Sequence, residues 1–292
     1  MPHNTSNIRI ITDSASDISP AEAEILNIDV LPLKTIFAGK EYQDGIELDA
    51  HGFYELLIET DAMPSTSQVS PFLFDEAFRR AREKDQDVLC LTLSNKLSGT
   101  NQSAHLAKRG LTESDQAHVH IIDTENVTIG EQLLVRLAIQ MRDSGKAISE
   151  IATTVEAHRK NVRVVGLLDT LEYLRRGGRI SSGAAIAGSL LSIKPVICIE
   201  EGEVKLIGKA RGSKNGRNLL VEAVNQYGGI DTTMPFRLAY SGLSRKLLDK
   251  YWADNHSLYA DWQGEPPVSH IGSVIGTHVG PGAIAVSFFS KK

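Results

Sequence analysis

Apolar and polar positions in the first half of the chain alternate between short buried runs and longer amphipathic stretches. Apolar runs of strand length occupy residues 8–12, 28–37, 87–93 and 118–123. Between them, apolar residues recur at helical spacing, as in the segment that begins at Ser70-Pro71. Strands that alternate with amphipathic helices predict a parallel sheet with helical crossovers.

Helix boundaries in this half are marked by capping residues. Ser19, Pro20 and Glu22 form a capping box with proline in the first turn, and Asp49 is placed to cap a second helix. Further helices are expected after Ser98-Gly99-Thr100, ending at Gly110, and over residues 130–143.

The pattern changes after about residue 160. Extended runs at 162–168, 194–200, 203–208, 236–240 and 268–289 mix with helical stretches at 170–176, at 213–227 and from residue 244 onward. Glu201-Gly202 lies between two of these runs and predicts a hairpin. The fold class expected is therefore α/β, with an N-terminal parallel-sheet α/β domain (1–160) packed on a C-terminal α+β domain (161–292), and a cleft between them.

Composition narrows the class of protein. Hydrophobic residues make up 41% and charged residues 23% of 292, and no apolar run approaches the roughly 20 residues of a membrane span. The first seven residues lack the features of a signal peptide. Cys90 and Cys198 lie inside apolar runs, which favours buried free thiols over a disulfide. We therefore expect a cytoplasmic location and no membrane insertion.

Charge is distributed unevenly. The net charge of −5 gives a nucleic-acid partner no global attraction, so none is expected. Residues 175–217, however, hold nine Lys and Arg against three Glu, a net +6 that leaves −11 on the rest of the chain. This segment is either an ordinary solvated surface or a face for an anionic partner.

Catalytic and metal-binding motifs are missing from the sequence. It contains no nucleophile elbow, zinc-protease motif, paired Cys-x-x-Cys or Walker loop. Gly280-Pro281-Gly282 begins a match to a dinucleotide fingerprint, but too few residues follow it for the required helix and strand. Asp13, Asp17 and Asp123 are interpreted as residues that cap helices and satisfy loop N–H groups, in preference to a Mg²⁺ site.

Two hydroxyl-rich turns are the main candidates for chemistry. Thr66 and Ser67 belong to one, and Ser98, Gly99 and Thr100 to the other. Both turns lie ahead of expected helices, so helix capping competes with ligand binding as their role, and the residues alone leave both open. The hydroxyls exceed what two caps need, and Gly99 would let backbone approach a ligand closely. His278 joins them as a candidate because the Gly-Pro-Gly turn after it would fix its direction.

Taken together, these motifs resemble the DegV family of bacterial lipid-binding proteins over nearly the whole chain. The matching segments are Ile11-Thr12-Asp13-Ser14, Tyr42-Gln43-Asp44-Gly45, Pro64-Ser65-Thr66-Ser67-Gln68, Leu97-Ser98-Gly99-Thr100, residues 170–180, Lys194-Pro195 and His278-Val279-Gly280-Pro281-Gly282.

The resemblance implies a two-domain protein that buries one long-chain fatty acid and has no cofactor or catalytic activity of its own. It implies that Thr66 and Ser98 hold the carboxylate, with Ser67, Gly99, Thr100 and His278 nearby. It further implies that the protein presents the fatty acid to a separate fatty acid kinase subunit for acyl-phosphate formation. Arg176, Arg179 and Arg211 would then face the partner or the phosphate.

The sequence departs from the family pattern at Gln132, where a Gly is frequent. A Gln there could shorten or reshape part of the pocket, which leaves the preferred chain length open. Ala285 also replaces a frequent Gly, with little consequence expected for the headgroup. Two rival functions remain: an enzyme acting on an acyl or phosphorylated substrate with Ser98 as nucleophile and His278 as base, and an interaction module working through the basic 175–217 segment.

Overall fold

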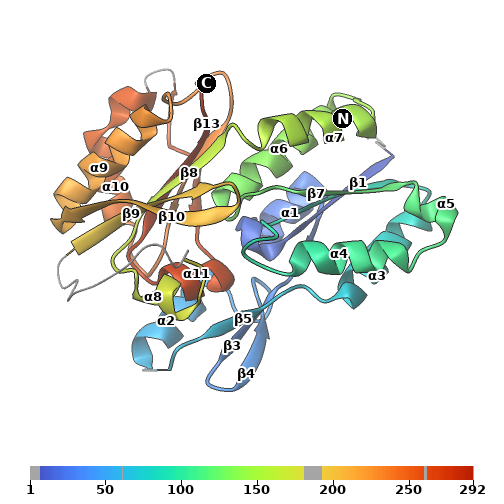
Figure 1. Cartoon of the computed structure of the whole chain (residues 1–292), viewed down its shortest axis with the longest axis horizontal. Coiled ribbons are helices and arrows are strands. Elements are labelled where there is room, and N and C mark those ends of the chain that lie inside the picture. The colour runs from blue at the N-terminus through green and yellow to red at the C-terminus, as the bar shows by residue number, and fades with distance from the viewer. Residues whose placement is uncertain (1–6, 61, 181–192, 260–261, 292) are drawn as a thin grey trace.

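A computed structural model describes residues 7–60, 62–180, 193–259 and 262–291 of the chain. Figure 1 shows two sheets side by side, with a small sheet below them at the bottom of the view. Among these residues, no helix is both long enough and apolar enough to cross a membrane.

The first sheet is parallel, as predicted. Its strands run in the order β2-β1-β6-β7, and all three neighbouring pairs are parallel. Their bounds are β1 (Ile8–Asp13), β2 (Asp29–Leu31), β6 (Asp87–Thr92) and β7 (Val119–Asp123). Ile10 and Ile11 are adjacent and belong to different buried clusters, because successive strand residues point to opposite faces.

Helices cover both faces of this sheet. One face packs against α3 (Pro71–Arg82) and α4 (Thr100–Arg109), and the other against α6 (Ile129–Asp143) and α7 (Ile148–His158). The shorter helices of this half are η1 (Ser14–Ser16), α1 (Pro20–Leu26), α2 (Ala50–Glu59) and α5 (Glu113–Gln116). The capping box of α1 is present as predicted, and Asp49 caps α2.

The expected extended run at 28–37 divides between two sheets. Its first part is β2, whereas its second part forms the small sheet β4-β3-β5. The bounds of this sheet are β3 (Lys34–Phe37), β4 (Lys40–Gln43) and β5 (Ser65–Ser67). Thr66 thus lies in a strand, and the cap of α3 is Ser70, so the alternative of Thr66 as a helix cap was wrong.

The second large sheet has the order β10-β9-β8-β13-β11-β12 and is antiparallel except for its β11–β12 pair. Its strands are β8 (Val162–Leu167), β9 (Ile193–Glu200), β10 (Glu203–Arg211), β11 (Phe236–Tyr240), β12 (Val268–His270) and β13 (Ile284–Phe289). The hairpin around Glu201-Gly202 is confirmed, with β10 three residues longer than predicted. The α/β plus α+β fold class is therefore confirmed, while the boundary at residue 160 remains a prediction.

The helices of this half are α8 (Glu172–Arg176), α9 (Gly212–Gln226), α10 (Lys246–Asp254), η2 (His256–Tyr259) and α11 (Ser273–Val279). The prediction of a continuous strand-like segment over 268–289 was wrong, because α11 interrupts it.

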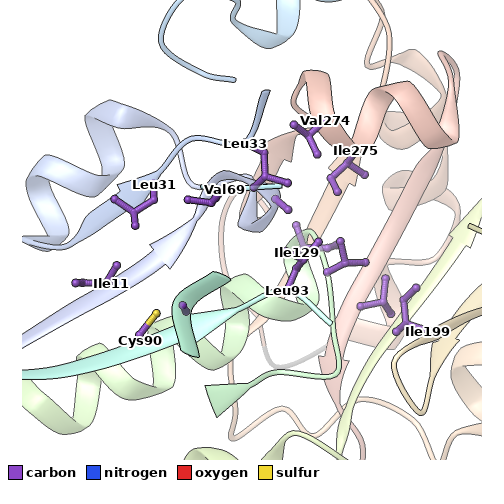
Figure 2. Close-up of a cluster of buried hydrophobic side chains, with 14 of the residues drawn as sticks. Ile11, Leu31, Leu33, Val69, Cys90, Leu93, Ile129, Ile199, Val274 and Ile275 are labelled. Carbon is purple, nitrogen blue, oxygen red and sulfur yellow. The ribbon is translucent and has the colours of Figure 1, made fainter. Parts of the chain in front are cut away.

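Helix α6 joins the two large sheets, packing on β1 as well as on β8, β11 and β13. Apolar side chains from both sides form one continuous core here (Figure 2). Leu33, Leu93 and Ile129 lie between Ile11 of the parallel sheet and Ile199 and Val274 of the other half. The candidate site lies along this junction.

Candidate functional site

A cavity of about 360 Å³ lies between the two halves of the chain. Its walls are mainly apolar and come from β8, β9, β13 and α11, with residues of the β6–α4 and β7–α6 connections. Val274, Ile275, Ile199 and Leu93 show this convergence in Figure 2. Of the predicted site residues, Thr66, Ser67, Ser98, Gly99, His278 and Arg179 line the cavity.

Strand β5 brings Thr66 to His278. Thr66 pairs with Thr35 of β3, and the hydroxyl of Thr35 lies 2.7 Å from that of Ser273 at the start of α11. Five residues further along α11, His278 Nε2 lies 2.9 Å from Thr66 Oγ1. The imidazole is thus fixed by α11 and its hydrogen bond, rather than by the Gly-Pro-Gly turn alone.

His278 is held neutral. Burial, and then the positive charge of Arg179, lower the pKa of His278 to about 4. Its Nδ1 is buried and has no hydrogen-bond partner in the described part of the chain. A Cβ on Gly177 would lie 2.3 Å from Nδ1, so glycine at 177 makes room for the ring.

The Ser98 turn is ordered by its own hydrogen bonds. Ser98 Oγ accepts from the backbone N–H of Thr100 at 3.3 Å and lies 2.9 Å from Thr100 Oγ1. Thr100 Oγ1 accepts in turn from the N–H of Val69. The proton of Thr100 is therefore available to Ser98, which leaves the Ser98 proton for a ligand. Thr100 is fully buried and does not line the cavity, so its predicted contact with ligand becomes a supporting role.

The absence of a side chain at Gly99 leaves room for the side chain of Gln68. A Cβ at 99 would lie 2.0 Å from Gln68 Oε1, and Gln68 Nε2 donates to Ser103 Oγ at 2.7 Å. Gly99 is also the N-cap of α4, whose first turn thus begins at the cavity. A helix N-terminus favours an anion at this place.

Arg179 is the only cation among the described lining residues. Its Nε donates to the carbonyl of Leu97 at 3.2 Å, and its Nη1 to the carbonyl of Gly177 at 2.6 Å. The side chain thereby ties the turn after α8 to the loop that carries Ser98.

Arg176 and Arg211 lie outside the cavity lining. Arg176 is exposed and donates to Glu172 at 2.5 Å. Hydrogen bonds from Arg175 and Arg176 lower the pKa of Glu172 to about 2. Arg211 is exposed at the end of β10.

Much of the predicted basic segment is neutralised by acidic neighbours. Its ion-paired members in the described chain are Arg175, Arg176, Lys194, Lys205 and Arg217. Residues 181–192 of this segment lie outside the described residues. The pairing weakens the case for a purely basic docking face.

Other predictions about polar residues are settled by contacts. Gln132, whose effect the sequence left open, is fully buried, accepts from Ser269 Oγ at 3.1 Å and does not line the cavity. Asp13 accepts from the N–H groups of Ala15 and Leu93, as interpreted.

Both cysteines are free and buried. No cluster of His, Cys, Asp or Glu in the described chain could hold a metal ion.

Sequence reasoning missed the apolar wall of the cavity. Val274, Ile275 and Val279 of α11 line it, and their spacing follows one face of a helix. That helical periodicity was the signal in the sequence that could have revealed this wall. The four glycines between 272 and 282 obscured it, because glycine disfavours helix.

Comparison with known proteins gives consistent matches over the full length. The family model described as "Uncharacterised protein, DegV family" matches residues 7–291. A DegV domain-containing protein from Deinococcus radiodurans is 34% identical over 282 residues, covering 96% of this chain and 98% of its own.

Solved structures agree. A DegV family protein from Thermus thermophilus, whose structure is described as showing fatty acid binding, has a TM-score of 0.84 and 32% identity, covering 97% of this chain and 99% of its own. A stearic acid-binding protein from Eubacterium ventriosum has a TM-score of 0.86 and 26% identity, covering 97% and 98%.

Proposed function

Because the chain belongs to the DegV family, we propose that it binds one long-chain fatty acid in the cavity between its two halves. The observation that carries the proposal is that one cavity has a polar part and an apolar part. Thr66, Ser98, His278 and Arg179 gather at one place in it, and the remaining walls are mainly apolar. A carboxylate with a long hydrocarbon tail matches both parts.

The polar group suits an anion. If neutral His278 donates its Nε2–H to Thr66, the Thr66 hydroxyl proton is free for a ligand oxygen, as is that of Ser98. Arg179 supplies positive charge beside them, and the first turn of α4 adds its partial positive charge. These donors replace the water that a buried carboxylate loses.

Tail and headgroup have separate roles in the binding free energy. Each buried methylene contributes about 0.8 kcal/mol, so a chain of ~15 methylenes provides most of the gross driving force. A hydrogen bond to a charged carboxylate adds only about 1.5–3 kcal/mol. The apolar walls therefore set affinity, while Thr66 and Ser98 set orientation and selectivity for a carboxylate.

The finer part of the proposal concerns what happens to the bound acid. We place its carboxylate within reach of a separate kinase subunit, which forms the acyl-phosphate, as the family resemblance implies. Thr66 and Ser98 are only half-buried, and the neighbouring Gln68 is exposed, so this end of the cavity lies close to the surface. Arg175 and Arg176 are exposed on α8 nearby and suit contact with the partner. A cytoplasmic location, suggested by the free thiols, belongs to the same proposal.

The rival enzyme is disfavoured by the geometry of His278. Its Nε2 is hydrogen-bonded to Thr66 instead of Ser98, and its Nδ1 lacks an orienting acid in the described chain. A nucleophile-and-base pair needs both contacts. Turnover of acyl esters by the isolated protein, lost in Ser98→Ala, would restore this alternative.

Mass spectrometry of the purified protein tests the proposal. Native spectra should show one bound ligand, and organic extraction should release one equivalent of a long-chain fatty acid. The Thr66→Ala/Ser98→Ala double variant should fold normally and retain much less. An empty wild-type protein that takes up no added fatty acid would overturn the proposal. A folded double variant with wild-type retention would show that the carboxylate lies elsewhere.

A further inference from the structure

Strand β8 places a glycine in the wall of the cavity. Its cavity face is formed by Val164, Gly166 and then Leu168, which directly follows the strand. In register with Gly166 lie Ile197 of β9 and Ala285 of β13, and both also line the cavity. The centre of the sheet therefore holds a glycine beside an alanine, with larger side chains around them.

The backbone does not require glycine at 166. Its φ is outside the left-handed region, so an L-residue fits there without strain. Glycine in the interior of a strand weakens it relative to alanine. Some property of the position other than its backbone conformation must therefore favour glycine.

Packing within the protein does not require glycine either. A Cβ at 166 would lie 3.5 Å from Ile197 Cγ1, 3.6 Å from the carbonyl oxygen of Ile284 and 3.9 Å from Ala285 Cβ, which are ordinary contact distances. Gly130 and Gly216 differ, because a Cβ there would lie 2.3 Å from Val164 and 2.6 Å from Leu167. Only the cavity gains space from the absence of a side chain at Gly166.

We propose that Gly166 is a specificity-determining residue, whose recess receives the bend of a cis-monounsaturated acyl chain and so favours it over a straight saturated chain. This inference rests on the proposed function and names its substrate class. A cis double bond fixes a lateral bend that needs room to one side. A straight chain passing over the recess leaves a gap, and its neighbours lose contacts there.

Ala285 takes part in the same recess from the neighbouring strand. Its Cβ is the nearest side-chain atom on the β13 side of the position where a Gly166 Cβ would be. Widening the recess at 285 and filling it at 166 should therefore have opposite effects on chain selection.

Competitive loading tests the inference. Lipid-free protein is loaded with an equimolar mixture of oleic and stearic acids, which have equal carbon numbers, and the bound acids are extracted and counted by mass spectrometry. Wild-type protein should retain mainly oleic acid. Gly166→Ala should shift the oleic-to-stearic ratio about tenfold toward stearic acid, the usual effect of one methyl group in an apolar pocket. Ala285→Gly should shift the ratio toward oleic acid.

Ser98→Ala is the matched control, because it should lower retention of both acids in equal proportion. Wild-type protein that prefers stearic acid, or an unchanged ratio in folded Gly166→Ala, would overturn the inference. If Gly166→Ala does not fold, an unchanged ratio in Ala285→Gly overturns it. These outcomes leave fatty acid binding intact, whereas wild-type protein that loads neither acid would contradict the proposed function as well.

Discussion

The imidazole Nε2 of His278 lies 2.9 Å from the hydroxyl oxygen of Thr66, a residue 212 positions earlier in the chain. Neither residue can adopt this arrangement alone. Thr66 is placed by pairing with β3, and His278 by a helix that packs on β3 and β5. The polar end of the cavity is therefore a joint product of both halves of the protein.

Replacing His278 should change how stability responds to acid. The pKa of His278 is lowered from 6.5 to about 4, so between these values the unfolded chain binds a proton that the folded protein does not. Wild-type stability therefore falls as pH decreases through this window, by up to roughly 3 kcal/mol from this residue. His278→Gln should lack that loss, measured by urea unfolding of lipid-free protein at pH 7 and pH 4.5.

Wild type must be compared with His278→Gln because other titratable groups change the stability with pH in the opposite direction. Burial raises the pKa values of Asp13 and Asp17 to about 7, so their contribution to stability decreases as pH rises. Both carboxyls are present in both proteins, and their effect cancels in the difference. Identical pH profiles for the two proteins would show that His278 is not held neutral by burial.

Replacing Glu131 should change how stability responds to alkaline pH. Burial, and then the charge of Asp13, raise the pKa of Glu131 well above its ordinary value. A raised carboxyl pKa gives stability that is present at low pH and is lost as pH rises through the folded value. Glu131→Gln keeps the shape without the charge, so its stability should fall less than that of wild type between pH 5 and pH 9. Parallel unfolding curves over this range would contradict the prediction.

Gly99→Ala should disturb the carboxylate site through Gln68. The added Cβ would lie 2.0 Å from Gln68 Oε1, and displacing that side chain breaks its hydrogen bond to Ser103. We expect a loss of about 1–2 kcal/mol in unfolding free energy and weaker fatty acid retention. Gln68→Ala removes the same hydrogen bond and also the obstructing atoms, so Gly99→Ala/Gln68→Ala should be about as stable as Gln68→Ala alone. A double variant clearly less stable than Gln68→Ala would place the strain elsewhere.

Substitution of Arg179 and substitution of Arg176 should have different effects on the rate of fatty acid dissociation. Arg179→Gln removes the cation of the cavity and its link to Leu97, so fatty acid should dissociate roughly tenfold faster or more. Arg176→Gln removes a similar charge from an exposed position paired with Glu172, and fatty acid dissociation should be unchanged. Dissociation rates from transfer to an acceptor vesicle measure both. Equal effects of the two variants would mean that general surface charge, and not the lining position, governs retention.

The sequence predicted the parallel sheet well because burial on both faces leaves apolar runs, as in residues 88–91 of β6. Thr66 and Ser98 line one cavity, but Thr66 reaches it from the antiparallel strand β5 and not from the end of a parallel strand. Prediction from the sequence failed for α11, where tertiary packing overrides local preference. Gly276 weakens the helix locally, but a Cβ there would lie 2.6 Å from both Phe53 and Tyr54.

The recess at Gly166 could not be predicted, since its meaning depends on neighbours in β9 and β13 that are remote in sequence. The effect of Gln132 could not be predicted for the same reason. A residue on α6 can face the cavity or the junction with Ser269, and only the packing of α6 decides between them.

The central position of β13 has a consequence for biosynthesis. This strand lies between β8 and β11, so the six-stranded sheet remains split into two parts until residues 284–289 have left the ribosome. His278 emerges only shortly before them. A nascent chain can complete its parallel sheet early, but its cavity cannot close until β13 has been made. Any ligand that the cavity encloses must therefore enter after β13 has been made.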